Sequence, residues 1–312
     1  MSIATLLRAE IAARGPLPFS RFMEVALYDP AVGYYRRDHF GKGGDFYTAE
    51  QLQPTFGLLL RRFCEQHGIT TIVQPGAGRA ALRESFAGME YVPLDLAYGR
   101  WPEAFSGLIL AHEFFDALVV DVAQREGGAW HELLVGWDGD GFVWTPGEGL
   151  AMEGIDERIE RVERPVGLAT ELENMAARLS SGYLLVLDYG YTRREQIRFP
   201  QGSLMGYRKH QAVEDVLANP GEQDITAHVP FSTLQETAHR LGFRTVREES
   251  MGSFLLRIGE ADHFAFLDLE GDAARRLQLK TLLFDLGESF RALLLEKPEH
   301  WQTGPQNDFG PG

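Results

Sequence analysis

The chain has 312 residues, of which 44% are hydrophobic and 24% are charged. These proportions are typical of a folded globular protein, and the length allows one large α/β domain or a domain with a substantial appendage. The formal net charge of −15 opposes non-specific binding to nucleic acid or to anionic membranes. We therefore expect a basic protein or peptide as the partner, and neither nucleic acid nor a membrane.

The single cysteine, Cys64, excludes an intrachain disulfide and a cysteine-rich zinc site, and it fits a reducing compartment. No apolar run approaches the roughly 20 residues that span a bilayer. The first helix, expected over residues 3–14, contains both Arg8 and Glu10 and leads directly into folded sequence. We therefore expect no targeting peptide and a cytoplasmic location.

After a second helix over residues 18–27, three glycines within residues 41–44 introduce the segment Asp45 to Thr48. Thr48 can cap a following helix whose apolar residues, Phe56 to Phe63, recur at helical spacing. Two interpretations stay open for this segment, an ordinary capped loop and a flexible lid over a ligand.

The stretch Thr70 to Leu82 combines a β-branched run, a glycine turn at Gly76 and Gly78, and a helix-forming segment. Such a unit begins nucleotide-type α/β folds, because small residues let the backbone approach a ligand at the carboxyl end of the strand. An ordinary strand-to-helix turn would show the same pattern. Asp95 ends the next strand, 17 positions beyond Gly78, where such folds place a carboxylate that binds ribose hydroxyls.

Two further strands are expected to deliver polar side chains at their carboxyl ends, where open α/β sheets bind ligands. The strand over residues 107–111 leads into His112, Glu113 and Asp116, and the strand over residues 183–191 carries Asp188. The string HEFFD resembles a zinc signature, but it follows a buried strand and lacks a matching third ligand. We expect no metal.

The remaining pattern predicts a hairpin over residues 129–145, and then alternating helices and strands. We expect a helix capped by Thr170, a helix over 232–241, strands over 243–248 and 254–256, and a helical tail over 264–296. The predicted divisions are an N-terminal helical region at 1–68, an α/β core with insertions at 69–260, and a tail at 261–312.

Seven strings in order resemble the MidA-like family of SAM-dependent methyltransferases, whose mitochondrial members act as complex I assembly factors. They are GPLPFSRFMEVALYDPAVGYY, GDFYT, PGAGR, LAHEFFDAL, LDYGY, GSLMGYRKH and DITAHV-F, spread over roughly residues 15 to 256. The resemblance implies a class I Rossmann-like sheet with N-terminal and C-terminal helical additions, and S-adenosylmethionine as cofactor. It assigns the cofactor contacts to Asp45, Thr48, Gly76, Ala77, Gly78, Asp95, His112 and Glu113.

In the mitochondrial members the family implies methylation of an arginine on a complex I subunit. Carboxylates can orient a guanidinium and accept its proton. We assign this role to Glu113 and Asp116, with Asp188 and His228 as secondary candidates. Asp116 could instead be a charge at a helix N-terminus, and His228 a buried hydrogen-bonded side chain.

The chain departs from the family pattern in the region of the cofactor. Gln74 stands where the family has an acidic residue, and Ala80 stands where it has a glycine. Gln51 and Pro230 each replace a carboxylate, and the segment after Asp95 is short. Two functions therefore follow from the sequence. The first is a SAM-dependent methyltransferase acting on an arginine of a protein, and the alternative is a catalytically degenerate fold that serves as a protein-binding assembly or scaffold factor.

Overall fold

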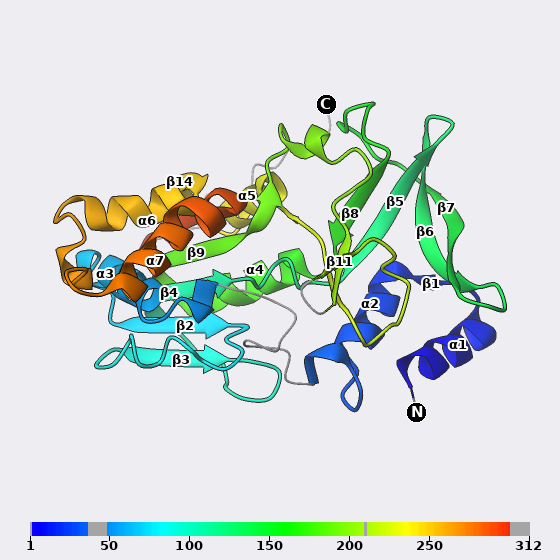
Figure 1. Cartoon of the computed structure of the whole chain (residues 1–312). Helices are drawn as coiled ribbons and strands as arrows, with labels where there is room; N and C mark the ends of the chain where they lie inside the picture. Colours follow the sequence, from blue (N-terminus) through cyan, green and yellow to red (C-terminus); the bar gives the residue numbers. More distant parts are fainter. Residues whose placement is uncertain (1, 37–48, 209–210, 300–312) are drawn as a thin grey trace, which may run out of the picture. The chain divides into compact units, whose positions relative to one another are not determined.

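The computed structural model describes residues 2–36, 49–208 and 211–299, and these form two compact units (Figure 1). The first unit comprises the described parts of Met1–Gln51, Glu113–Leu168 and Tyr189–Ser232. The second comprises those of Leu52–His112, Ala169–Asp188 and Thr233–Gly312. Each unit is therefore assembled from separated stretches of sequence. The predicted divisions at residues 68 and 260 stay a prediction.

The second unit is built around a mainly parallel sheet, as a class I Rossmann-like fold requires. Its strand order is β14-β15-β9-β4-β2-β3, and β2, β3, β4 and β9 run parallel. The strands are β2 (Thr71–Pro75), β3 (Glu90–Leu94), β4 (Phe105–His112), β9 (Leu179–Tyr191), β14 (Arg244–Ser250) and β15 (Phe290–Lys297). The central strands are buried apolar runs, the pattern expected of a sheet covered on both faces.

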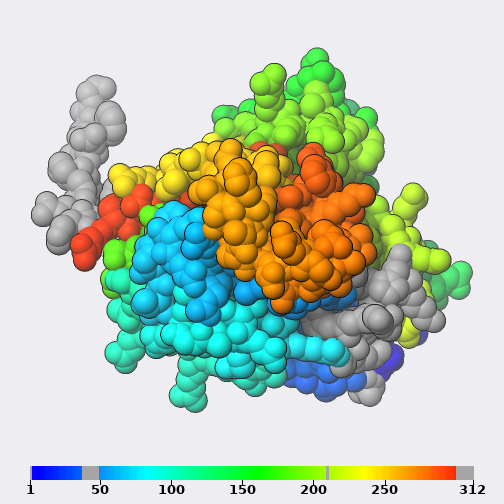
Figure 2. All heavy atoms as spheres, turned by 60° about the vertical axis from the view of Figure 1, so that its left-hand side comes forward, coloured from blue at the N-terminus to red at the C-terminus, as the bar shows by residue number. Residues whose placement is uncertain are grey.

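Helices pack around this sheet. Figure 2 shows α6 and α7 on the surface beside α3, and α3 contacts both of them. The helices of the second unit are α3 (Thr55–Gln66), α4 (Leu168–Arg178), α5 (Phe231–Arg240), α6 (Met251–Glu260), α7 (Ala273–Lys280) and α8 (Leu286–Ser289). A 3-10 turn at Ala265–Leu267 and a π-helical turn at Thr281–Asp285 lie between them.

The first unit contains an antiparallel sheet with the strand order β1-β6-β5-β8, to which β7 adds beside β6. These strands are β1 (Leu17–Pro18), β5 (Val120–Glu126), β6 (Ala129–Trp137), β7 (Phe142–Leu150) and β8 (Arg161–Pro165). A smaller antiparallel sheet consists of β11 (Gln211–Val213), β10 (Met205–Arg208) and β12 (Asp224–Thr226). In addition, β13 (Val229–Pro230) pairs with Gly190 and Tyr191 at the end of β9.

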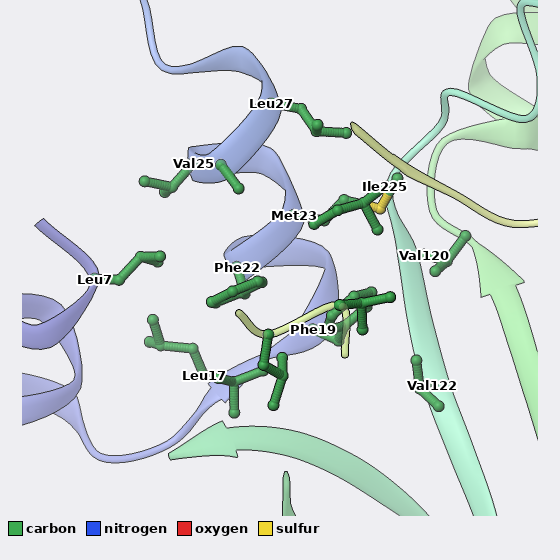
Figure 3. Close-up of a cluster of buried hydrophobic side chains, with 14 of the residues drawn as sticks. Leu7, Leu17, Phe19, Phe22, Met23, Val25, Leu27, Val120, Val122 and Ile225 are labelled. Carbon is green, nitrogen blue, oxygen red and sulfur yellow. The ribbon is translucent and has the colours of Figure 1, made fainter. Parts of the chain in front are cut away.

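The core of the first unit joins the two sheets through α2 (Phe19–Tyr28), with α1 (Ile3–Arg14) packed beside it. Figure 3 shows Met23 of α2 pointing toward Ile225 of β12, and Phe19 on the side of β5, which carries Val122. Phe22 lies on the opposite side of α2, toward Leu7 and Leu17. All of these side chains are buried, and burying such a side chain stabilises the fold by about 1.5–3 kcal/mol. The packing fixes where α2 ends relative to β12.

Most predicted elements are confirmed, including the first two helices, the hairpin, the parallel strands and the helix near residues 232–241. The predicted helix after the glycine turn is wrong. Residues 79–88 form successive turns, and Ala80 has a left-handed backbone, with φ of 52°, which an α-helix cannot contain. The capping role of Thr170 is also wrong, because α4 already begins at Leu168.

Two predictions near the C-terminus are wrong in opposite directions. The expected strand at residues 254–256 lies within α6, where the Ser250 side chain accepts a hydrogen bond from the Ser253 amide and caps the helix. The expected helical tail instead ends at Ser289, and Phe290–Lys297 forms β15 between β9 and β14. Its leucine-rich run is buried in the sheet, so tertiary pairing overrides helix propensity.

Candidate active site

The carboxyl ends of four parallel strands meet at one edge of the second unit. Pro75 of β2 pairs with Leu94 of β3, and His112 of β4 pairs with Leu187 of β9. Gly76, Asp95 and Asp188 directly follow three of these positions. The strand-end candidates of the second unit are therefore brought together at the edge where open α/β sheets bind their ligands.

The glycine turn is held against Asp95 by short hydrogen bonds. The Gly78 amide donates to Asp95 Oδ2 at 2.8 Å, and the Leu96 amide donates to Oδ1 of the same carboxylate at 2.7 Å. The Ala77 amide donates to the Leu94 carbonyl at 2.9 Å. Gly76 and Gly78 adopt φ of 68° and 51°, conformations that favour glycine.

These residues fit an adenosyl cofactor. Asp95 is half-buried, and each of its carboxylate oxygens can accept a further hydrogen bond beside the backbone amide that it already binds. In folds of this type, such a carboxylate accepts hydrogen bonds from the ribose hydroxyls.

Gln74, which replaces the family's acidic residue, is fully buried and accepts a hydrogen bond from the Tyr91 hydroxyl at 2.5 Å. The substitution is therefore accommodated within the fold.

His112 and Asp188 are both buried beneath this edge. The His112 ring packs against Phe56 at a centroid distance of 5.1 Å and lies nearly parallel to Phe290 at 6.0 Å. Asp188 is fully buried. Their roles as cofactor contact and secondary catalytic residue stay predictions.

Glu113, the first residue after β4, has a left-handed backbone with φ of 48°. A non-glycine residue in this conformation stores backbone strain, and such strain is concentrated at functional sites. The side chain is half-buried. The conformation supports a functional role at the position that the sequence singled out, and the role itself stays a prediction.

The first unit carries a group of side chains that we name the tyrosine–carboxylate cluster, comprising Tyr35, Asp116, Tyr207 and Asp224. The Tyr35 hydroxyl donates to Asp224 Oδ1 at 2.7 Å, and Tyr207 pairs directly with Asp224 across β10 and β12. Asp116 is close enough to raise the pKa values of both tyrosines. Both carboxylates are buried.

The two tyrosine hydroxyls of the cluster both have raised pKa values. Burial first, and then the charge of Asp224, raises the pKa of the Tyr35 hydroxyl well above its usual value. Burial, followed by the charges of Asp116 and Asp224, also raises the pKa of the Tyr207 hydroxyl. The tyrosines therefore remain neutral hydrogen-bond donors at neutral pH, while the two carboxylates favour a positively charged partner.

Separate parts of the chain deliver these residues. Tyr35 follows α2, and the Tyr28 hydroxyl near the end of that helix donates to the Ala117 carbonyl at 2.5 Å. The Ala227 amide, just after β12, donates to the Asp116 carbonyl at 3.5 Å. Sequence reasoning found Asp116 but missed Tyr35, Tyr207 and Asp224, although each lies within a string that carries the family resemblance.

His228 lies in the first unit, with its ring among aromatic side chains. It packs edge-on against Phe199 at 4.7 Å and nearly parallel to Tyr189 at 6.5 Å. Burial, with a smaller effect from Arg198, lowers the pKa of His228 and favours the neutral ring at neutral pH. A neutral imidazole can accept a proton, and the catalytic role of His228 stays a prediction.

The remaining predictions concern Asp45 and Thr48, a metal ion and a membrane. Asp45 and Thr48 lie outside the described residues. Within the described ranges, no group of three or more His, Cys, Asp or Glu side chains is placed to hold a metal ion. Across the same ranges, no helix is long and apolar enough to cross a membrane.

Comparison with known proteins agrees with this geometry. A family of S-adenosyl-L-methionine-dependent methyltransferases matches residues 79–248, more than half of the chain. A crystal structure of a Burkholderia thailandensis protein bound to S-adenosyl-homocysteine superimposes with a TM-score of 0.85 at 28% sequence identity, covering 95% of this chain and 92% of that one. The predicted fold, cofactor and enzyme class are confirmed, in preference to the non-catalytic alternative.

Two curated relatives carry the name protein arginine methyltransferase NDUFAF7, mitochondrial. The Danio rerio protein is 28% identical, covering 89% of this chain and 81% of the relative. The Homo sapiens protein is also 28% identical, covering 73% and 67%, respectively. These names overturn the predicted cytoplasmic location. That prediction relied on the single cysteine, on the absence of an apolar span and on the interpretation of the first helix as folded sequence, and none of these specifies a compartment.

Proposed function

Because this chain belongs to the S-adenosyl-L-methionine-dependent methyltransferase family, we propose that it methylates an arginine side chain of a basic protein substrate. The names of the curated relatives support arginine as the acceptor. The observation that carries the proposal is the tyrosine–carboxylate cluster of the first unit, with its two buried carboxylates and two tyrosines.

A guanidinium group is a planar cation with five N–H donors and no acceptor. The cluster offers the complementary groups, since Asp116 and Asp224 supply negative charge and acceptor oxygens. The Tyr35 and Tyr207 rings supply flat surfaces on which a guanidinium can stack. A lysine ammonium would satisfy the charge but would use neither the planar face nor the paired acceptors as fully.

When bound, S-adenosylmethionine supplies an activated methyl group that needs no covalent help from the protein. The protein's task is to hold the acceptor nitrogen in line and to deprotonate it, because a protonated guanidinium is a poor nucleophile. In the proposed roles, Asp224 and the Tyr35 hydroxyl hold the guanidinium, and Asp116 or Glu113 accepts the proton released as the nitrogen is methylated.

In the second unit, the glycine turn and Asp95 would hold the cofactor. The amides of Ala77 and Gly78 are already engaged with Leu94 and Asp95, so the turn is fixed before a ligand binds. Asp95 has the remaining acceptor capacity for the ribose hydroxyls. Adenosyl recognition is thus assigned to the second unit and acceptor recognition to the first.

The test is transfer of tritium-labelled methyl groups to a set of basic peptides, each made with arginine and again with lysine at the acceptor position. We expect label only on the arginine series, and acid hydrolysis should release methylarginine. Label on the lysine series, or on neither series from a protein that binds S-adenosylhomocysteine, would contradict the arginine assignment. The adenosyl-binding assignment would stand in that case.

A further inference from the structure

A buried carboxylate outside the cluster has no ion-pair partner among the described residues. Glu163, on β8, is 3% exposed, and three of its hydrogen bonds within the described ranges come from Ser203. Burial raises the pKa of this carboxyl above its usual value. Apolar side chains commonly replace buried ionisable groups without loss of stability. Burial of a carboxylate at this position is therefore not by itself evidence of a stabilising role.

The geometry around Glu163 is specific to a carboxylate. The Ser203 amide donates to both of its oxygens at 3.1 Å, and the Ser203 hydroxyl donates to Oε2 at 3.2 Å. The preceding residue, Gly202, has φ of 78°, and a Cβ atom there would lie only 2.0 Å from Glu163 Oε1. A side chain at position 202 would displace the carboxylate, so Gly202 and Ser203 form a cradle for it.

The connection continues to a second segment. The Ser203 hydroxyl oxygen accepts a hydrogen bond from the His228 amide at 2.9 Å. The segment that begins at Ser203 continues along the chain into β10, which carries Tyr207. The segment that ends at His228 follows β12, which carries Asp224. Because β10 and β12 pair with Tyr207 opposite Asp224, the link at Ser203 closes the same ladder at its other end.

We propose that Glu163 is a positioning residue, whose buried carboxylate uses Ser203 to set the two segments that present Tyr207 and Asp224. Its catalytic consequence rests on the proposed function, since the cluster is the predicted acceptor site. The positioning itself is independent of the substrate. Glu163 belongs neither to the tyrosine–carboxylate cluster nor to the glycine turn, and its loss should alter acceptor recognition while leaving adenosyl binding intact.

The experiment compares Glu163→Gln, Glu163→Ala, Ser203→Ala and the double variant Glu163→Ala/Ser203→Ala. Glu126→Gln, at the exposed end of β5 in the same sheet, is the matched control. Amide hydrogen exchange should rise about tenfold or more over residues 203–208 and 224–228 in Glu163→Ala, because each lost hydrogen bond weakens local protection. It should rise less in Glu163→Gln, which keeps one acceptor oxygen, and not at all in Glu126→Gln.

Kinetics provide the second measurement. KM for an arginine peptide should rise about tenfold in Glu163→Ala and in Ser203→Ala, while the Kd for S-adenosylhomocysteine stays within twofold. The double variant should be no worse than either single variant, because both act through one link. Glu163→Gln serves as the folding control, because glutamine has nearly the same side-chain volume as glutamate.

The two proposals fail in different ways. A wild-type protein without activity on arginine peptides would remove the acceptor assignment, and the exchange pattern would then decide the role of Glu163. Unchanged exchange in both segments, or a rise spread evenly over the first unit, would overturn the positioning role. So would a loss of adenosyl binding that equals the loss of peptide binding.

Discussion

The two units prepare ligand recognition in different ways. In the second unit the groups at the sheet edge are backbone amides and strand-end residues, fixed by the parallel register and by the turn at Gly76 and Gly78. In the first unit they are side chains from distant segments. Tyr35 and Asp224, for example, are hydrogen-bonded although 189 positions separate them. In the proposed roles, local geometry would therefore position the cofactor, and long-range packing would position the acceptor.

This difference predicts where substitutions act. A change to a carboxylate of the tyrosine–carboxylate cluster should alter chemistry without altering adenosyl binding. A change in the glycine turn should have the opposite effect. Each experiment below breaks or sharpens this separation, and all of them use the whole chain, because each unit is assembled from interleaved segments.

The largest expected effect is that of Asp116→Asn. The amide keeps the shape of the side chain but can neither accept a proton nor neutralise a guanidinium, and general-base catalysis contributes about 10²–10⁴-fold to a rate. We expect methyl transfer to fall by that order in single-turnover assays, with an unchanged Kd for S-adenosylhomocysteine. Asp140→Asn, in the exposed hairpin turn, is the control. A variant that retains full activity would remove Asp116 from the mechanism.

Asp95→Ala should show the converse pattern. It removes the carboxylate that accepts the Gly78 and Leu96 amides, and charge-assisted hydrogen bonds contribute about 1.5–3 kcal/mol each. We expect the Kd for S-adenosylhomocysteine, measured calorimetrically, to rise at least about tenfold. Glu90→Ala, at the other end of β3, should leave it unchanged. Equal losses in the two variants would mean that general destabilisation of β3, rather than a ribose contact, explains the effect.

The buried carboxylate of Glu163 gives a smaller, pH-dependent effect. Its pKa is raised in the folded state, so the folded chain binds the proton more tightly than the unfolded chain does. The resulting stability is fully present below the unfolded pKa, near 4.5, and is lost as the pH rises through the folded value. Urea unfolding across this window should show the free energy of unfolding falling with pH in the wild type more steeply than in Glu163→Gln. Parallel pH profiles would contradict this prediction.

The same contrast between units explains which parts of the site the sequence could predict. Gly76, Gly78, Asp95 and His112 follow short apolar runs, and the rule that ligands bind at the carboxyl ends of parallel strands needs only local pattern. Tyr35, Tyr207 and Asp224 follow no such rule. They come together because α2 packs between β5 and β12, and no periodicity within any one segment encodes that packing.

The errors in the predicted fold have a similar origin. The run at residues 254–256 is too short to separate a strand from a helix by period, and it lies in a helix that Ser250 caps and whose apolar residues are buried. The run Phe290–Lys297 contains good helix formers, yet it completes the sheet as β15. Local propensity decides neither case, because the neighbouring element supplies more free energy than propensity does.

Ala80 provides the smallest and most local test of this contrast. Where the family pattern has glycine, this chain places an alanine at φ of 52°, a conformation that costs an L-residue about 1–2 kcal/mol. In Ala80→Gly the relief of strain is offset by about 0.4–1 kcal/mol of added freedom in the unfolded chain. We expect a net gain of roughly 0–1.6 kcal/mol in the free energy of unfolding, measured with urea. Because the turn is already held by the Gly78–Asp95 hydrogen bond, the Kd for S-adenosylhomocysteine should stay within about threefold, an interval of roughly 0.6 kcal/mol. An affinity gain of tenfold or more would show that the strain at Ala80 extends to the cofactor turn, and that this turn is fixed less firmly by its backbone than its hydrogen bonds indicate.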